Sequence, residues 1–270
     1  QPRSRGLGDV YKRQEMHLFR DNAEAALRSA ARAGPEHVAL AQARLAVARS
    51  SGGAAAALAA VPMRLRSDSS FVFAQAQHHR RKKEADVSAR LIASLPRDAA
   101  QLVDGDEWWV ERRLIARQLL DKGLNAEAYA VAAGHAAERP QSVIEAEWHA
   151  GWIALRFLND AAKALPHFEE AARQAETPIS MARTAYWRGQ ALEALGRRDE
   201  ARAAYEAAAR QPIAFYGQIA RARLGLRDLP LRQAQASAPH ESLAMVKALE
   251  AADQHKLCLL YTSPSPRDRG

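Results

Sequence analysis

Apolar residues recur at helical spacing in the C-terminal half of the chain, and turn-forming residues interrupt the pattern. Trp187, Ala191 and Leu195 follow one another at intervals of four before Gly196. A second set follows this glycine at intervals of four and three: Ala201, Tyr205 and Ala208. Such intervals place side chains on one face of a helix, and glycine commonly ends helices. The pattern therefore predicts two helices that turn at Gly196.

The same pattern occurs once more upstream. Ala164, Phe168 and Ala171 precede the second set by 37 residues, and Gly151 precedes Gly189 by 38. Self-similarity at such a period is typical of stacked helical repeats. Because the two offsets differ by one residue, we expect irregular repeats rather than a regular array.

The turn positions repeat as well. Asn159 lies 37 residues before Gly196, and Gly123 lies another 36 residues upstream. Asparagine, like glycine, tolerates the left-handed conformation that often ends a helix. We therefore predict helical hairpins over 109–140, 146–178 and 184–212. Each hairpin buries one face and leaves another for its neighbour, so several are needed for stability.

Helices are also expected on both sides of these hairpins. Residues 16–62 are Ala-rich and broken at Gly34-Pro35 and at 50–53, and an amphipathic helix pair is expected over 71–95. Prolines are expected to close successive helical units. They are Pro35, Pro62, Pro96, Pro140, Pro178 and Pro212. The larger core candidates of the first third are Leu40, Leu45, Val47 and Leu58.

The remaining segments are polar or carry one further helix each. A charged loop over 98–107 leads into Trp108-Trp109, and a third helix over 213–224 follows the last hairpin. Beyond Pro230 a linker rich in Gln and Ala precedes a last helix over 241–253. Nothing in this pattern indicates an independent second domain.

Composition supports a helical fold. The chain is 48% hydrophobic, and alanine rather than β-branched residues carries most of this content. Alanine favours helices and close helix packing over sheet. We predict an all-α protein, a superhelix of irregular antiparallel helix pairs similar to a tetratricopeptide α-solenoid.

The two ends of the chain differ from the rest. Residues 4–14 and 258–268 show no helical periodicity, and both can be back-translated from opposite strands of one nucleotide sequence that resembles a sequencing-library adapter. We therefore expect non-native tails over 1–14 and 258–270 and exclude them from fold reasoning, as for any fusion scar. The α-superhelical domain is then expected over 15–257, as a fragment of a longer protein.

This exclusion changes the charge and the cysteine count. The formal net charge is +8, of which the two tails carry +3 and +1, which leaves +4. The single cysteine, Cys258, lies in the second tail, so no disulfide or thiol chemistry is expected. No apolar run reaches the ~20 residues that a membrane-spanning helix needs.

One basic run has the residue types of a metal or nucleic-acid site. His78 and His79 precede four cations over 80–83. Adjacent helical histidines point about 100° apart, and no ligand-type residue lies one turn away, so no metal site is expected. Nucleic-acid binding needs a recognisable module beside the charge. We interpret the run as a solvated basic face and expect no nucleic-acid partner.

Two histidine–glutamate pairs stand at helical contact spacing, His167 with Glu170 and His149 with Glu145. Such pairs are frequent on charged helices, so we interpret both as surface pairs rather than catalytic dyads. The sequence has no G-x-S-x-G, no H-E-x-x-H and no Gly-rich phosphate loop. No catalytic, metal-binding or cofactor-binding residue is assigned, and no cofactor is expected.

The tryptophans allow two interpretations. All five tryptophans stand in helical patterns, namely Trp108, Trp109, Trp148, Trp152 and Trp187. Aromatic side chains at this spacing are more often core than exposed, although they also stack on sugar rings. We favour the core interpretation and keep the sugar-stacking alternative open.

Residues 66–226 resemble the N-terminal helical region of soluble lytic murein transglycosylases. The most specific elements are EWWVERRLIARQLL at 107–120, TPISMARTAYWRGQALEALG at 177–196 and FYGQIARARLG at 215–225. Further points of likeness are RSD at 66–68, the basic helix around Arg80-Arg81 and AEWHAGWIALRFL at 146–158. In that family the helical region curls into a superhelical ring before a lysozyme-like domain.

The resemblance implies a parent enzyme that acts on peptidoglycan in the periplasm. It would cleave between N-acetylmuramic acid and N-acetylglucosamine and leave a 1,6-anhydro product, with one Glu as acid and base. A Glu-Ser pair marks that active site, but Glu241-Ser242 lacks the Gly-Leu-Met-Gln element that follows in the family. We assign this pair to the start of a helix, where a carboxylate is favoured. The fragment itself is expected to be inactive.

The expected function is therefore a non-catalytic scaffold that guides glycan strands, with cell-wall proteins as further partners. Its cations would face the carboxylates of peptide stems, consistent with the residual charge. The rival from another class is a helical-repeat adaptor that binds a protein or peptide in its groove. Nucleic-acid binding, which predicts a steep salt dependence, ranks last.

Overall fold

The N-terminal third of the structure, a computed structural model, consists of short Ala-rich helices. The structure describes residues 7–20, 22–93 and 95–226. This part contains α1 (Leu7–Phe19), α2 (Ala23–Ala33), α3 (Pro35–Ala48), α4 (Ala54–Ala59) and a 3₁₀ turn (Met63–Leu65). The predicted breaks are confirmed, because the chain reverses at Gly34 and at Ser50, both with positive φ. The four predicted core residues Leu40, Leu45, Val47 and Leu58 are all buried.

The middle third adds one helix pair, a short helix and the first predicted hairpin. These elements are α5 (Ser69–Arg81), α6 (Ala85–Ala93), α7 (Ala99–Leu102), α8 (Gly105–Asp121) and α9 (Asn125–Ala133). The predicted pair over 71–95 is confirmed. The segment 98–107 is not the continuous loop we expected, because α7 and the first turn of α8 lie within it. The side chain of Asp104 accepts hydrogen bonds from the backbone of Asp106 and Glu107 and so starts α8 early.

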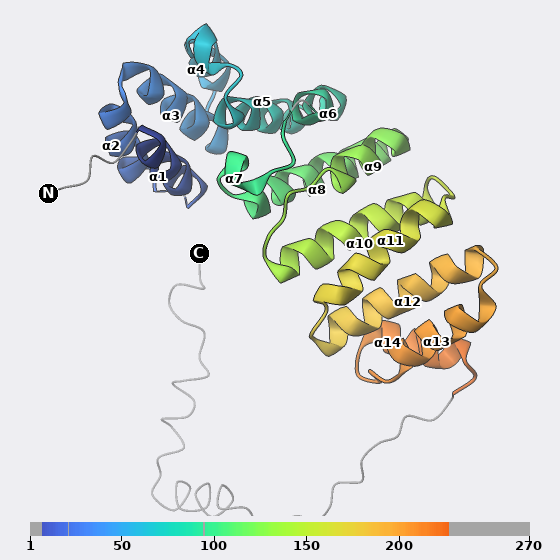
Figure 1. Cartoon of the computed structure of the whole chain (residues 1–270). Coiled ribbons are helices and arrows are strands. Elements are labelled where there is room, and N and C mark those ends of the chain that lie inside the picture. The colour runs from blue at the N-terminus through green and yellow to red at the C-terminus, as the bar shows by residue number, and fades with distance from the viewer. Residues whose placement is uncertain (1–6, 21, 94, 227–270) are drawn as a thin grey trace, which may run out of the picture. The chain divides into compact units, whose positions relative to one another are not determined.

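The last third contains the two clearest hairpins and one further helix. They are formed by α10 (Pro140–Arg156) with α11 (Ala161–Gln174) and α12 (Pro178–Ala194) with α13 (Arg198–Ala209), followed by α14 (Phe215–Arg223). Figure 1 shows that helices adjacent in sequence lie side by side here, and contacts join α9 to α10, α11 to α12 and α13 to α14. The turn residues are as predicted, since Gly123, Asn159 and Gly196 have φ of 73°, 53° and 75°.

All regular elements in the described residues are helices, so the all-α prediction is confirmed. They belong to one compact unit, Gln1–Arg227. The superhelical course of the pairs stays a prediction. The expected linker beyond Pro230, the expected helix over 241–253 and the second tail lie outside the described residues.

Two expectations need correction. Residues 7–14, which we excluded as lacking helical periodicity, form most of α1, and Gln14 is fully buried. Once a helix has started, adding a residue costs little, so a segment without an apolar stripe can extend one. The prolines were expected to close helical units, but Pro35, Pro140 and Pro178 each open the next helix. At the first helical position the missing N–H costs nothing and φ is already set.

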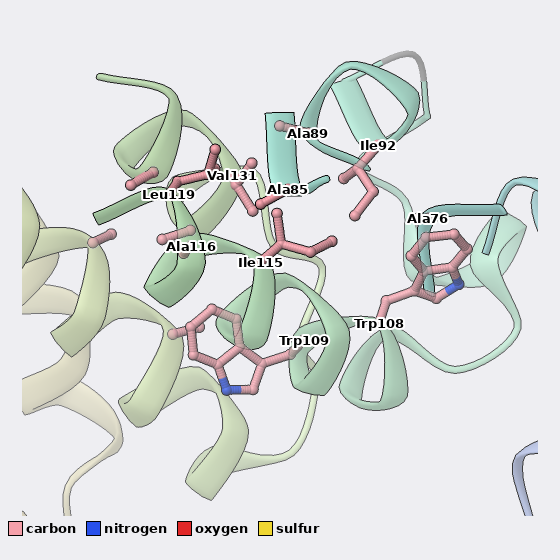
Figure 2. Close-up of a cluster of buried hydrophobic side chains, with 14 of the residues drawn as sticks. Ala76, Ala85, Ala89, Ile92, Trp108, Trp109, Ile115, Ala116, Leu119 and Val131 are labelled. Carbon is pink, nitrogen blue, oxygen red and sulfur yellow. The ribbon is translucent and has the colours of Figure 1, made fainter. Parts of the chain in front are cut away.

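The largest core cluster lies around α8. Figure 2 shows Trp108 and Trp109 on this helix, together with Ile115, Ala116 and Leu119 of the same helix and with alanine, isoleucine and valine side chains of α5, α6 and α9. Trp108 meets Phe73 edge to face at 4.7 Å between ring centroids, and Trp109 meets His149 at 5.4 Å. The adjacent tryptophans therefore join α8 to α5 on one side and to α10 on the other.

Candidate functional site

The basic run at the end of α5 contains two arginines that bond to other helices. Arg80 pairs with Glu111 through two contacts of 2.5 and 3.1 Å, and the Glu111 side chain is only 3% exposed. Arg81 donates to the backbone carbonyls of Val47 and Ala48 at the end of α3. The exposed Arg81, Lys82 and Lys83 fit the predicted solvated basic face, but Arg80, whose side chain is 14% exposed, does not. Arg80 and Arg81 also join α5 to other helices. Their partners lie more than 30 residues upstream or downstream, where no local pattern points to them.

The histidines of this run do not converge on a metal. His79 Nδ1 lies 2.6 Å from Glu84 Oε2, whereas His78 contacts the edge of the His79 ring. Burial and the nearby Lys82 lower the pKa of His78. Within the described residues no group of three His, Cys, Asp or Glu side chains is arranged to hold a metal ion.

His149 and Glu145 do not form the surface pair that we predicted. His149 is buried, and its Nδ1 donates to the backbone carbonyl of Glu145 at 2.7 Å. The Glu145 carboxylate instead accepts from Arg113 at 2.6 Å and faces the indole N–H of Trp109. Burial lowers the pKa of His149, so the ring is held neutral in the packed interior.

His167 also has a different partner from the expected Glu170, which pairs with Arg173. The Glu147 carboxylate lies between two imidazoles, 2.5 Å from His167 Nδ1 and 3.1 Å from His135 Nε2. His167 Nε2 faces the Tyr129 hydroxyl at 2.9 Å.

This network joins three segments of chain. Burial alone raises the pKa of Glu147, but the hydrogen bonds from both histidines outweigh it and hold the pKa at about 2. Each ring has its second nitrogen satisfied, by the Tyr129 hydroxyl for His167 and by the Ala137 N–H for His135. A carboxylate ionised so firmly and enclosed by donors is poorly suited to general acid–base catalysis. The network is a structural link between α9, α10 and α11.

The tryptophans divide into two groups. Trp108 and Trp109 are 1% and 2% exposed, which confirms the core interpretation for them. Trp148, Trp152 and Trp187 are only half-buried and lie together. Trp148 stacks on Trp152 with centroids 5.7 Å apart and planes within 11°, and it meets Trp187 edge to face at 6.0 Å.

This second group borders an open cavity of about 650 Å³ between α10, α12 and α14. We call it the aromatic cavity. Its lining is Trp152, Arg156, Phe157, Tyr186, Trp187, Gln190, Phe215, Tyr216 and Ile219. Six of these nine residues belong to the resemblance elements at 177–196 and 215–225, so the most specific sequence features meet here.

Ring-to-ring contacts fix the walls of the aromatic cavity. Trp152 meets Phe157 edge to face at 4.9 Å, and Tyr186 and Tyr216 lie 5.4 Å apart. Behind them the Arg183 guanidinium lies 5.1 Å from the centroid of Trp148, and burial lowers the pKa of Arg183. Aromatic faces held by neighbours in this way lose little conformational entropy when a ligand stacks on them.

Polar groups lie at the edges of the aromatic cavity. Gln190 donates to the Tyr205 hydroxyl at 2.8 Å, which in turn donates to Glu193. Arg156 ends α10 with an exposed side chain. Apolar walls with a few polar groups are typical of sites for small molecules that present both kinds of surface.

The sequence placed the tryptophans in helices but did not show which would meet. Trp152 and Trp187 lie on different hairpins, and Tyr216 lies on a third element that the repeat pattern did not include. Comparison of the chain with known protein families, with curated proteins and with solved structures gives no match. In the described part of the chain, no helix combines the length and apolar character that crossing a bilayer requires.

Proposed function

We propose that this chain is the non-catalytic helical region of a lytic murein transglycosylase, and that its aromatic cavity receives sugar rings of peptidoglycan. The observation that supports the proposal is the convergence of aromatic rings from three helices on one open cavity. The parent enzyme would act in the periplasm and cleave the bond between N-acetylmuramic acid and N-acetylglucosamine. The chain itself would contribute binding and no bond cleavage.

The chemistry of the aromatic cavity suits an amphipathic sugar. A pyranose ring presents C–H groups on its faces and hydroxyl groups on its rim. The former pack on aromatic rings such as Trp152 and Tyr216, and the latter need donors and acceptors of the kind that Arg156 and Gln190 carry. The N-acetyl methyl groups of the two sugars add apolar surface. A charged nucleic-acid backbone would find only Arg156 among the lining residues.

Sedimentation with purified sacculi tests the proposal. Phe215→Ala removes a lining ring that is 68% exposed, and Ile213→Ala removes a neighbouring side chain that is 81% exposed and outside the cavity. Both changes leave buried packing intact. We expect Phe215→Ala to weaken binding about fivefold, the equivalent of ~1 kcal/mol for one stacked ring, and Ile213→Ala to leave it unchanged.

The variants Phe215→Ala and Ile213→Ala also distinguish glycan binding from the two rival functions. An adaptor that docks a protein on this surface would lose affinity with either variant, because both side chains are exposed and apolar. A nucleic-acid partner would give a steep loss of affinity with salt that neither variant alters. Equal binding of sacculi by the unaltered chain and by Phe215→Ala would contradict the proposed role of the aromatic cavity.

A further inference from the structure

A second cavity, which shares no residue with the aromatic cavity, is lined by a buried cation that has no counter-ion in the described part of the chain. Arg112 on α8 is 3% exposed, and its Nη1 donates to the carbonyl of Val131 at 3.2 Å. Its Nε is buried and has no hydrogen-bond partner among the described residues. Arg80 and Arg113 each pair with a glutamate, but no carboxylate of the described residues lies within salt-bridge distance of Arg112.

A second guanidinium approaches the same point. A methyl group built on Gly134 would lie 3.0 Å from Arg112 Nη1 and 3.7 Å from Arg97 Nε. Both arginines thus border the space over one glycine. Burial and, to a smaller extent, the charge of Arg97 together lower the pKa of Arg112 to about 10. Two cations at close range repel each other unless an anion lies between them.

The fold offsets only part of the free energy that it costs to bury Arg112 beside a second cation. Val131 lies in the last turn of α9, where carbonyl groups carry partial negative charge, so Arg112 acts in part as a cap of that helix end. That contact uses one of five N–H donors of the guanidinium. A buried charge without a counter-charge destabilises the folded state by far more than one hydrogen bond stabilises it. The remaining donors are therefore available to a ligand.

The cavity beside Arg112 has a volume of about 390 Å³ and two kinds of wall. Ala89, Ile92 and Val131, all labelled in Figure 2, form part of an apolar wall between α6 and α9. The carboxylates on the rim are Asp86, which pairs with Arg90 and Lys122, and the exposed Glu127. With three arginines against two carboxylates, the lining residues carry a small positive excess that suits a single negative charge.

We propose that this cavity binds a monocarboxylate with a short apolar chain, its carboxylate held between Arg112 and Arg97 and its chain against the wall of Ile92 and Val131. Arginine donors match the two oxygens of a carboxylate, and hydrogen bonds to a charged acceptor are strong. A dianion such as phosphate is disfavoured, because Asp86 and Glu127 lie on the same rim and would repel its second charge. This site does not depend on the proposed glycan function, since the two cavities share no residue.

Titration of the folded chain with hexanoate, followed by two-dimensional NMR of backbone and arginine N–H groups, tests the site. We expect shifts confined to residues around Gly134 and to the Arg112 side chain. Hexanamide has the same shape without the charge and is expected to bind at least about tenfold more weakly. Inorganic phosphate is the second probe and is expected to give no such shifts.

Three variants test the geometry. Arg97→Gln removes the exposed second cation and is expected to weaken hexanoate binding about tenfold. Arg90→Gln removes the same charge from the same cavity, but Arg90 is already paired with Asp86. We therefore expect this variant to weaken hexanoate binding by less than about twofold. Gly134→Ala keeps every charge and places a methyl group between the two guanidinium groups, so it is expected to abolish binding.

Several results would overturn the proposal. They are equal affinity for hexanoate and hexanamide, equal effects of Arg97→Gln and Arg90→Gln, or phosphate shifts of the same size at the same residues. The absence of any hexanoate shift in a folded sample at 50 mM, well above millimolar affinity, would do the same.

Discussion

Gly189 lies directly against the ring of Tyr205, so closely that a methyl group at Gly189 would come within 2.6 Å of the ring carbon Cε1. Gly151 and Phe168 form the equivalent contact in the preceding hairpin, at 2.8 Å. Each contact joins the two helices of one hairpin. The repeated unit is therefore defined by a glycine under an aromatic ring.

This contact gives the first prediction. Gly189→Ala places a methyl group in the Tyr205 ring, which must shift together with its helix, and we expect a loss of about 2 kcal/mol in the free energy of unfolding. Urea denaturation measures it. Gly52→Ala is the control, because no atom lies within 4 Å of the added methyl group. A loss below about 0.5 kcal/mol for Gly189→Ala would show that the ring moves without cost.

A second prediction concerns the buried carboxylate of the histidine network. In Glu147→Gln one histidine N–H must face the amide NH₂ group, so a buried donor loses its acceptor. We expect a loss of about 2 kcal/mol at neutral pH. Glu127→Gln removes the same charge from an exposed position and is expected to change stability by less than about 0.5 kcal/mol.

The difference in stability between the unaltered chain and Glu147→Gln depends on pH, because the pKa of Glu147 is lowered in the folded chain. The carboxyl group binds its proton more weakly in the folded chain, at about 2, than its ordinary 4.5. Its contribution is therefore complete above pH 4.5 and is lost as the pH falls from there towards 2. Stability of the unaltered chain and of Glu147→Gln should converge over this window. A difference that stays constant down to pH 2 would contradict the assigned role of the histidine hydrogen bonds.

The third prediction compares two arginines replaced by the same residue. Arg80→Met leaves the buried Glu111 carboxylate without its partner, and we expect a loss of about 3 kcal/mol. Arg112→Met removes a buried charge that has no carboxylate partner among the described residues, so we expect a change of less than about 1 kcal/mol in the free energy of unfolding, in either direction. Thermal or urea unfolding of both variants checks this. Equal losses would mean that Arg112 has a counter-charge within the chain.

A fourth prediction concerns the start of α12. Thr177 and Ser180 cap this helix reciprocally, each side chain accepting from the backbone N–H of the other. Thr177→Ala removes one of these bonds, and we expect a loss of about 1 kcal/mol, measured by urea denaturation. Ser51→Ala, which removes a solvent-exposed contact to Gly53, should have a smaller effect. The reverse order would show that α12 is held by packing alone.

Much of the fold could be predicted because its signals are local. Spacing of Phe168 and Tyr205, with turns at Asn159 and Gly196, was enough to place the turns and second helices of the last two hairpins. Their helices begin earlier than expected, since Pro140 and Pro178 open them. The helix over 7–14 could not be predicted, because it extends a neighbouring helix rather than carrying a pattern of its own.

The side-chain partners were less predictable because they come from distant segments. His167 lies one turn from Glu170 in sequence, yet its partners are Glu147 and Tyr129, 20 and 38 residues away. Helical spacing shows which residues share a face, but not which face of another helix lies opposite. The aromatic cavity was missed for the same reason, since Tyr216 belongs to a helix outside the repeat pattern.

The one-residue mismatch between the repeats has its origin in the connections. The glycines are 38 residues apart and the aromatic rings 37, and the segment between α10 and α11 is one residue longer than that between α12 and α13. The extra residue is thus accommodated in the connection at the tip of the hairpin, and the contact between the glycine and the aromatic ring is present in both hairpins. Insertions and fused peptides should accordingly be tolerated at these tips and nowhere near the crossing point, which makes the tips the natural places to attach a label or a second module.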